Sequence, residues 1–451
     1  MPMKFKAFLI ILLLLTSCQS VPRNINSFEV QFHPDGKLYV GDQLSLEVFP
    51  NNQQDLKGKQ VSISVEGKNL ATADFSPNGI GQREQATFWW AIDTTGWEPG
   101  KKAITFSILP GGSTWDESIT IYPENDNPYK DSVWETKDTD CCTLHYITGT
   151  DAAREITELS KMVDLQADDV EAKLSTTIQD PIDITFLPKL IGQGGFATNS
   201  IYVSYLDANI TGDIAAQVIH HEMVHILDSS LGGEGQPAFM VEGLAVYLSN
   251  GHYKQENLLP RSSYLLDLNA YIPLTDLLKD FYNQQHEIAY LEAGAMITYM
   301  VDKYGWDDYK KFYGDVDMNA KPSVDVVEAL SQVYGLNLEQ LEAGFIDALH
   351  SQEKNDTDQK DLALTIAFFD SIRLYQQKLD PSTYYATAWL PDGATMQEKG
   401  IVADYLRSDE RLDKSIVENL LRMISRLITD KDYKHADWGI KLVNGILALY
   451  P

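Results

Sequence analysis

Hydrophobic and polar residues alternate with a period of two along the first part of the chain. The clearest runs are residues 28–32, 44–49 and 61–65, and short stretches rich in Pro, Asn and Gly separate them. Because successive side chains of a β-strand point to opposite faces, this alternation predicts half-buried strands. About six or seven such strands within about a hundred residues predict a β-sandwich over residues 27–123.

The pattern changes after a polar and acidic stretch at residues 124–138, which we expect to be a linker. Apolar residues recur at helical spacing over residues 151–174, and a short run at residues 182–187 predicts a strand that stops at a proline. From residue 213 onward nearly every segment has helical spacing. Together these features predict an α+β domain over residues 139–350.

A second polar break, at residues 351–360, is followed by further amphipathic segments such as residues 416–428. They predict a helical region over residues 361–451. The whole pattern therefore predicts a multidomain chain, with an all-β sandwich first, an α+β domain next and a helical C-terminal region last.

The amino-acid composition excludes two broad classes of protein. The chain of 451 residues carries 36 Lys and Arg against 65 Asp and Glu, a formal net charge of −29. We expect no nucleic-acid partner, because no excess of positive charge exists to neutralise phosphates. Three cysteines are too few for a disulfide-stapled scaffold. Cys141 and Cys142 are adjacent; a disulfide between them is possible outside the cell, but two unpaired residues are the favoured interpretation.

The first residues predict an export signal. Two lysines precede the apolar run 7–15, which is too short to cross about 30 Å of hydrocarbon. The sequence Leu-Thr-Ser-Cys that ends at Cys18 resembles the bacterial lipobox, whose cysteine is acylated and becomes the first mature residue. The resemblance implies a signal peptide at residues 1–17, a tether at residues 18–26 and a lipid anchor on Cys18. We therefore expect an extracytoplasmic protein on a bacterial membrane, on the cell surface or facing the periplasm.

The motif His-Glu-x-x-His stands within a run of helical spacing. His221 and His225 are four residues apart, so they lie on one face of a helix and can bind one zinc ion through their imidazole nitrogens. Glu222 is rotated by about 100° from His221 around the helix. Its carboxylate can lie beside the metal without coordinating it, where it can take a proton from zinc-bound water.

A third zinc ligand follows on a second apolar segment. Glu242 completes a His-His-Glu site for one zinc ion and leaves the fourth position for water. Gly243 is expected to let this second helix pack closely against the helix of the motif. His220 is five residues from His225 and points to a different face, so we expect it to pack or to support a ligand.

These residues resemble the motifs of the gluzincin metallopeptidases of the peptidase MA-like type. The shared features are HExxH and the Glu-Gly-x-Ala that begins at Glu242 on a separate helix. The resemblance covers about residues 140–350 and implies an α+β zincin fold, one zinc ion at His221, His225 and Glu242, and Glu222 as the general base.

The N-terminal region resembles an immunoglobulin-like domain, although it lacks the cysteines that join the two sheets of that family. The resemblance implies a sandwich with a buried aromatic core. Trp89, Trp90 and Trp97 are expected to lie in this core, because aromatic side chains dominate the interior of sandwiches; the alternative is a ligand-facing aromatic cluster.

The glycine-rich segment upstream of the metal helix matches the substrate strand of this peptidase family. There an edge strand binds extended substrate by main-chain hydrogen bonds, and the residues in that place here are Gly195, Phe196 and Ala197. An ordinary glycine turn followed by a strand is the alternative. Aminopeptidases carry a Glu in this segment to hold the free amine of the substrate. This chain has none, so the predicted activity is that of an endopeptidase.

Peptide hydrolysis also needs a hydrogen-bond donor for the negative charge that develops on the carbonyl oxygen. The segment from Tyr290 to residue 296 resembles the helix that supplies a tyrosine for this purpose in related enzymes. We expect Tyr290 in that role, with His286 as an alternative and Tyr282 and Tyr299 as weaker candidates.

The combined expectation is a membrane-anchored zinc peptidase that hydrolyses peptide bonds of a peptide or protein substrate by zinc-activated water. The alternative is a surface binding or scaffold lipoprotein that retains a structural zinc site. Glu222 favours hydrolysis, because a structural site has no use for a carboxylate beside an open coordination position. The sequence leaves the substrate and the oligomeric state open.

Overall fold

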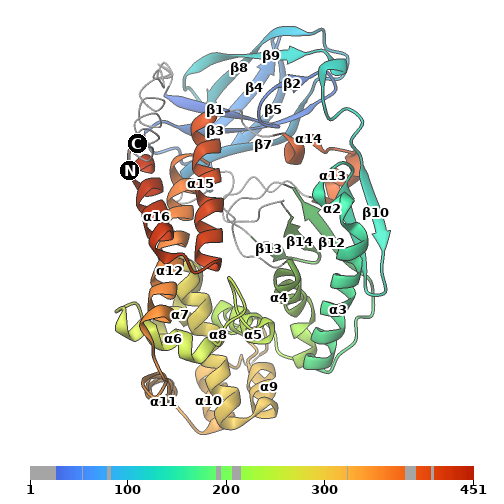
Figure 1. Cartoon of the computed structure of the whole chain (residues 1–451). Coiled ribbons are helices and arrows are strands. Elements are labelled where there is room, and N and C mark those ends of the chain that lie inside the picture. The colour runs from blue at the N-terminus through green and yellow to red at the C-terminus, as the bar shows by residue number, and fades with distance from the viewer. Residues whose placement is uncertain are drawn as a thin grey trace. The chain divides into compact units, whose positions relative to one another are not determined.

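The computed structural model describes residues 27–52, 54–78, 83–188, 194–205, 215–321, 323–380, 393–407 and 411–450. The expected signal peptide, the tether and Cys18 lie outside these residues. The chain forms two compact units, and each takes part of the predicted C-terminal region. The first combines the described residues up to Asp131 with those from 393 to Val417; the second combines Ser132–Thr383 with Glu418–Pro451. The N-terminal part is rich in strands, and the C-terminal part is mostly helical (Figure 1).

The first unit contains two β-sheets that share one hydrophobic core. One sheet has the order β1-β3-β7-β6 and the other the order β2-β9-β8-β4-β5. The strands are β1 (Phe28–His33), β2 (Leu38–Tyr39), β3 (Gln43–Pro50), β4 (Gln60–Val65), β5 (Lys68–Asp74), β6 (Ser76–Asn78), β7 (Arg83–Asp93), β8 (Gly100–Leu109) and β9 (Thr114–Tyr122); a 3₁₀ turn, η1 (Glu124–Asp126), follows.

The expected core tryptophans of this sandwich are not its buried ones. Trp89 is 43% exposed and Trp90 is half-buried; Trp97 is also half-buried but packs against this core. The buried ring is that of Trp115, which stacks between Phe28 and Phe106 at centroid distances of 5.4 and 5.3 Å. The strand β7 is irregular at this point: its register with β3 shifts between Leu44 and Leu46, and the Trp90 backbone is left-handed, with φ +44°.

A segment from the C-terminal part of the chain packs into the first unit. It forms α13 (Gly393–Lys399) and α14 (Ala403–Leu406) and ends at Arg407. The Arg407 guanidinium donates to both carboxylate oxygens of Asp42, at 2.5 and 2.8 Å, and lies over the ring of Tyr39. Both charged side chains are buried, so each needs the other to compensate for lost hydration.

The second unit is built around a five-stranded sheet of order β10-β11-β12-β14-β13. The three central strands are parallel to one another, and both edge strands are antiparallel to their neighbours. The predicted strand at residues 182–187 is confirmed as β12. The elements are β10 (Trp134–Asp138), β11 (Cys142–Ile147), α2 (Asp151–Arg154), α3 (Ile156–Leu174), β12 (Ile182–Leu187), β13 (Gly195–Ala197) and β14 (Ile201–Ser204).

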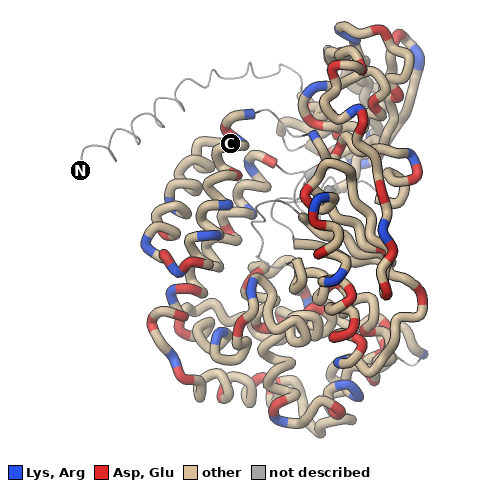
Figure 2. The backbone as a smooth tube through the Cα atoms, turned by 45° about the vertical axis from the view of Figure 1, so that its right-hand side comes forward, with Lys and Arg blue, Asp and Glu red and all other residues tan. Residues whose placement is uncertain are grey.

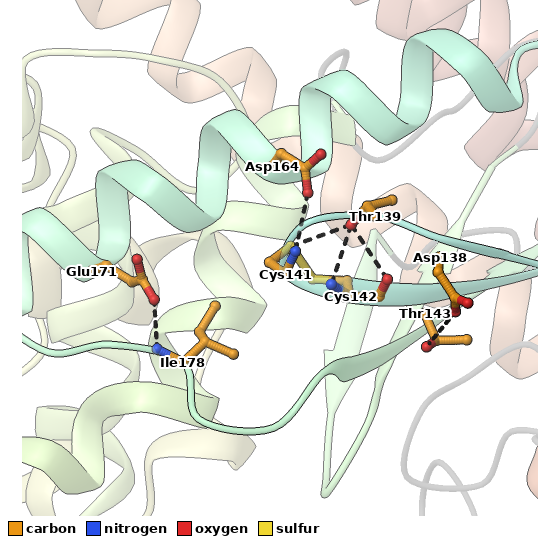
Figure 3. The surroundings of a disulfide bond; sticks show 8 residues. All are labelled: Asp138, Thr139, Cys141, Cys142, Thr143, Asp164, Glu171 and Ile178. Atoms are coloured by element: carbon orange, nitrogen blue, oxygen red, sulfur yellow. Dashed lines mark hydrogen bonds between the residues drawn. A yellow bond between two sulfur atoms is a disulfide. The ribbon is translucent and has the colours of Figure 1, made fainter.

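The adjacent cysteines form a disulfide at the start of β11, where the sequence favoured two unpaired residues. Figure 3 shows the surrounding hydrogen bonds: the Cys141 amide donates to Asp164 of α3, and the Cys142 amide donates to the Thr139 hydroxyl. These contacts tie the turn between β10 and β11 to the helix that covers the sheet.

Helices make up most of the rest of the second unit. Several begin at a side-chain cap, such as α11, where Asn337 and Gln340 form a capping box. The elements are α4 (Ala215–Leu227), η2 (Asp228–Leu231), α5 (Ala238–Ser249), α6 (Leu258–Asp267), α7 (Leu274–Lys279), η3 (Phe281–Asn283), α8 (His286–Tyr304), α9 (Trp306–Asp315), α10 (Val326–Tyr334), α11 (Leu338–His350), α12 (Asp356–Lys378), the part of α15 (Leu412–Thr429) from Glu418 onward, and α16 (Tyr433–Leu447).

The excess negative charge is spread along the chain. Figure 2 marks the positions of acidic residues along the backbone of both units, with basic residues interspersed among them. Among the residues that the structure describes, no helix is both long and apolar enough to span a membrane.

Helices α5 and α8 cross at two glycines. A Cβ atom on Gly243 of α5 would lie 3.0 Å from the Ala293 carbonyl oxygen, and one on Gly294 of α8 would lie 2.4 Å from Val246 Cγ1. The close approach that the sequence assigned to Gly243 is therefore made with α8, not with the helix of the His-Glu-x-x-His motif. Backbones that approach this closely fix the position of α5.

Glu292 is a buried carboxyl on the same helix, α8. It is 1% exposed and accepts a hydrogen bond from the Ile272 amide at 3.1 Å. Burial raises the pKa of Glu292 well above 4.5, and the nearby Glu342 raises it further. The folded state therefore favours the protonated carboxyl.

This shift predicts a pH-dependent stability. A carboxyl whose pKa is raised on folding binds more protons in the folded state, so stability falls as the pH rises above 4.5. Glu292→Gln keeps the acceptor oxygen but cannot ionise. We expect the variant to gain on the order of 1 kcal/mol over wild type between about pH 5 and about pH 8. Urea unfolding of both proteins at the two pH values measures this gain, and a constant difference would contradict the assignment.

Candidate metal centre

The helix α4 is buried because its apolar residues face neighbours on several sides. Ile219, Met223 and Val224 have no exposed surface, and α4 packs against α3, α5 and the strands β13 and β14. The same helix carries two histidines one turn apart. Their rings, of His221 and His225, have centroids 4.8 Å apart and stand nearly perpendicular, at 82°.

Helix α5 brings a carboxylate to both histidines. One Glu242 oxygen, Oε2, lies 3.2 Å from His221 Nε2 and 3.3 Å from His225 Nε2. One ligand atom from each residue lies within 4.8 Å of the other two, the one such cluster among the residues that the structure describes. The structure therefore brings together all three residues expected to bind zinc.

The three donors fit a zinc ion. Tetrahedral zinc with bonds of ~2.0–2.1 Å places its donor atoms about 3.3 Å apart. The two nitrogen–oxygen distances of 3.2 and 3.3 Å match that separation. Two imidazoles and one carboxylate are also the donor types that zinc binds at catalytic sites.

The electrostatics of the cluster favour a cation. Burial acts to raise the pKa of Glu242, but His225 and His221 outweigh it and hold that pKa well below 4.5. Burial acts to lower the pKa of His225, yet the Glu242 carboxylate raises it to about 9. A buried carboxylate thus holds a positive charge beside it, in the place where a metal ion would lie.

Glu222 lies next to this cluster, and its pKa is shifted upward, whereas that of Glu242 is shifted downward. It is buried on α4, and burial raises the pKa of its carboxyl to about 7. A carboxyl with that pKa can both accept and release a proton near neutral pH, as a general base and acid must. Glu222 does not need to coordinate the metal, because the other three residues form the cluster without it.

Helix α3 holds both metal-binding helices in place. His220 Nε2 lies 2.8 Å from Asp169 Oδ2, which ties α4 to α3. One turn later Lys173 donates to the Leu248 carbonyl oxygen at the end of α5, at 2.7 Å. His220 therefore supports the helix and faces away from the metal-binding residues, one of the two roles expected from its spacing.

Two tyrosines lie at the cluster. The Tyr282 hydroxyl donates to Glu242 Oε1 at 2.7 Å, although 62% of the residue is exposed. Tyr290 of α8 has its ring centroid 6.2 Å from that of His221, and burial raises the pKa of its hydroxyl well above 10. Both tyrosines can therefore donate a hydrogen bond near neutral pH. Tyr299, the other weak candidate, instead accepts from Lys303 and packs on Phe345.

His252, to which the sequence assigned no role, also lies beside the metal cluster. His252 stacks on Tyr290 at 4.2 Å, and its Nδ1 lies 3.0 Å from Glu287 Oε2. His286 packs against both rings, and burial lowers its pKa well below 6.5. His252 follows α5 by three residues, and its position next to a ligand-bearing helix was the only signal in the sequence.

The expected substrate residues form β13, an edge strand. Among the described residues, β13 pairs only with β14, with Phe196 opposite Tyr202. A Cβ atom on Gly195 would lie 2.8 Å from Val218 Cγ1 and 3.5 Å from Glu222 Cγ. The strand therefore passes directly beside the helix turn that carries Glu222. The missing side chain of Gly195 is what allows that approach.

Comparisons with known proteins add little to this geometry. No family model matches the chain, and no curated protein matches it. Among solved structures it is similar to an aminopeptidase N family protein from Idiomarina loihiensis, with a TM-score of 0.32 and 10% identity. That likeness covers 74% of this chain and 78% of the other.

The cluster predicts one zinc ion per chain. We expect the wild type to bind zinc stoichiometrically and its melting temperature to rise with added zinc, because an ion that binds only the folded state stabilises it. His221→Ala removes one of three donors and is expected to hold less than about 0.1 zinc per chain. Elemental analysis and thermal unfolding measure both effects. His145→Ala, on the β-sheet, is the matched histidine control and should keep its zinc.

Proposed function

We propose that this chain is a zinc-dependent peptidase of the gluzincin type that hydrolyses internal peptide bonds. The observation that carries the proposal is the arrangement on α4 and α5: three convergent donors with the buried Glu222 carboxyl beside them. A purely structural zinc site uses four protein ligands and needs no further acid or base. Here three ligands and a titrating carboxyl lie together, which supports catalysis over the scaffold alternative.

The metal, when bound, would supply a Lewis acid that polarises a carbonyl oxygen and makes water a stronger nucleophile. The remaining steps belong to the residues of the chain. Glu222 takes one proton from the attacking water as the new carbon–oxygen bond forms. It then gives that proton to the leaving amine as the carbon–nitrogen bond breaks, so one water molecule is consumed for each bond cleaved.

The negative charge that develops on the carbonyl oxygen of the substrate needs a hydrogen-bond donor. We assign this role to Tyr290. Its hydroxyl keeps its proton because burial raises its pKa, and its ring lies against His221. Tyr282 also reaches Glu242, but most of its ring is exposed, so it is better suited to contact bound substrate.

The substrate is proposed to lie along β13 in an extended conformation. An edge strand offers main-chain donors and acceptors on its open side, and a peptide that pairs with it becomes a further strand of the sheet. The pairing would carry the peptide past Gly195 and hence past Glu222. The described part of the glycine-rich segment, residues 194–199, has no acidic residue to hold a free amine, which favours an endopeptidase.

The cellular setting is part of the same proposal. A lipid on Cys18 would anchor the protein outside the cytoplasmic membrane and keep the enzyme near substrates of the cell envelope or of the medium. The disulfide between Cys141 and Cys142 supports this setting, because disulfides persist in oxidising compartments.

Replacement of Glu222 tests the reaction. Glu222→Gln keeps the size of the side chain but cannot accept the proton, so kcat on a cleaved peptide should fall by about 10²- to 10⁴-fold. Zinc content should stay at the wild-type value because the three ligands are intact. Peptide-library cleavage followed by mass spectrometry gives the rates. A variant with zinc and wild-type activity would refute the role of Glu222, and a zinc-loaded wild type that cleaves nothing would favour the scaffold alternative.

Replacement of Gly195 tests the substrate strand. A methyl group there would lie 2.7 Å from the Tyr202 carbonyl oxygen and 2.8 Å from Val218 Cγ1, so β13 must shift away from α4. We expect Gly195→Ala to lower kcat/KM by about tenfold or more while zinc content is unchanged. Ala197→Gly, on the same strand, adds no atoms and is the control. Equal activity of Gly195→Ala and wild type would show that substrate does not lie along this strand.

A further inference from the structure

The loop that follows α5, residues 250–257, has a fixed and compact shape. It starts at Asn250, which caps α5 in the left-handed conformation, and at Gly251, whose φ is +139°. A Cβ atom on Gly251 would lie 2.0 Å from the Lys254 carbonyl oxygen. The Glu256 amide closes the loop by donating to the Asn250 carbonyl oxygen at 2.9 Å. The close approach at Gly251 and this hydrogen bond therefore hold the loop in a compact shape.

One residue of this loop faces the metal centre. His252 is held on one side by Glu287, whose side chain is fully buried, at 3.0 Å. Its ring stacks on Tyr290, with centroids 4.2 Å apart and an interplanar angle of 29°, and lies 6.1 Å from the ring of His221. His252 thus forms part of the surface against which the Tyr290 ring rests, together with His286 and Phe281.

The next residue of the loop packs against the C-terminal helices. The ring of Tyr253 lies 5.4 Å from that of Phe369 and 6.2 Å from that of Phe368, both on α12. Its hydroxyl is 3.0 Å from Ser425 Oγ on α15. His252 and Tyr253 therefore connect the metal centre to helices that lie more than a hundred residues later in the chain.

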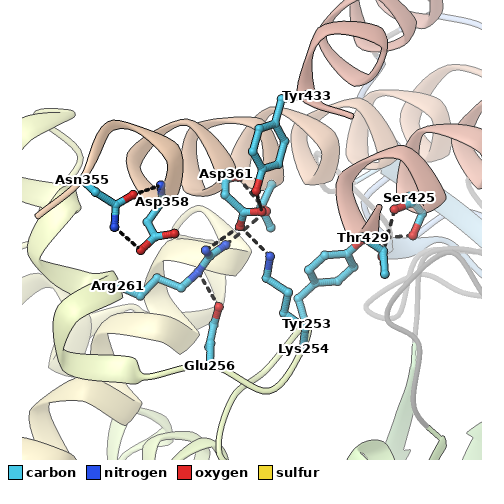
Figure 4. A network of polar contacts seen from close by, with 11 residues as sticks. Tyr253, Lys254, Glu256, Arg261, Asn355, Asp358, Asp361, Ser425, Thr429 and Tyr433 are labelled. Atoms are coloured by element: carbon cyan, nitrogen blue, oxygen red, sulfur yellow. Dashed lines mark hydrogen bonds and ion pairs between the residues drawn. The ribbon is translucent and has the colours of Figure 1, made fainter. Parts of the chain in front are cut away.

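A buried carboxylate on α12 holds the loop from this side. Asp361 is 4% exposed and accepts hydrogen bonds from Lys254 Nζ at 2.5 Å, Arg261 Nη1 at 2.6 Å and the Tyr433 hydroxyl at 2.9 Å. Arg261 Nε in turn lies 2.5 Å from Glu256 Oε2 (Figure 4). The carboxylate thus joins α6, α12, α16 and Lys254 of the loop, and Arg261 extends the network to Glu256. Removal of one partner from such a buried network leaves the others uncompensated.

We propose that Asp361 is a positioning residue of the metal centre: through Lys254, Arg261 and the loop it fixes His252, and His252 fixes the ring of Tyr290. The inference rests on the proposed function, because it assigns Tyr290 a role in hydrolysis. It gives the helices α12 and α16 a part in assembling the site, although neither helix carries a residue of the metal cluster.

The first measurement needs no substrate. Hydrogen exchange of the backbone amides of residues 251–257 is compared between wild type and Asp361→Asn, which keeps the shape of the side chain but removes its charge. We expect these amides to exchange about tenfold faster in the variant. Tyr375→Phe is the matched control, because it removes another buried hydrogen bond of α12, to Glu418, without touching the loop. Unchanged exchange in Asp361→Asn, or an equal rise in the control, overturns the proposal.

The second measurement asks whether Asp361 acts through Tyr290. We expect Asp361→Asn to lower kcat by about tenfold with little change in KM and with full zinc content, and Asp361→Glu to recover part of the loss. In a Tyr290→Phe background the same substitution should have no further effect on kcat. Additive losses overturn the assignment to Tyr290. If Asp361→Asn does not fold, Tyr433→Phe, which removes only one hydroxyl, takes its place. A wild type without peptidase activity contradicts the proposed function, while the exchange data still decide whether Asp361 holds the loop.

Discussion

The second unit depends on one constraint: the carboxylate of Glu242 and the imidazoles of His221 and His225 must stay together where little water can hydrate them. Helix α5 is buried on nearly all sides, and Glu242 is its only charged residue. An ionised carboxylate in such a place is stable only with partners at hydrogen-bonding distance. His221, His225 and Tyr282 are those partners. The contacts that hold α4 and α5 in their relative positions therefore also keep the Glu242 carboxylate ionised.

Three sets of contacts meet this constraint, and each uses a different kind of interaction. Polar contacts from Asp169 and Lys173 tie α3 to both helices. Steric contact at Gly243 and Gly294 brings α5 and α8 together at backbone distance. The charged network around Asp361 acts on the loop at the end of α5. The apolar core alone would tolerate small shifts between helices, but distances of about 3 Å between polar atoms do not.

The sequence revealed what depends on local spacing and missed what depends on tertiary packing. The positions of His221 and His225 follow from helix geometry, and the strands of the sandwich from alternation. No short sequence pattern connects the segments that meet in three other places. These are the contact between Gly243 and α8, the stacking of Trp115 in the core, and the stacking of His252 on Tyr290. The disulfide between Cys141 and Cys142 was missed because the choice between a bond and two thiols depends on the surrounding turn.

The two buried arginine–aspartate contacts affect the order in which parts of the protein can fold. Asp42 meets Arg407 across 365 residues of chain, and Arg261 meets Asp361 across 100. During synthesis Asp42 stays hydrated until Arg407, 365 residues later in the chain, is available to pair with it. Such distant pairings slow folding, because the intervening chain must first be ordered.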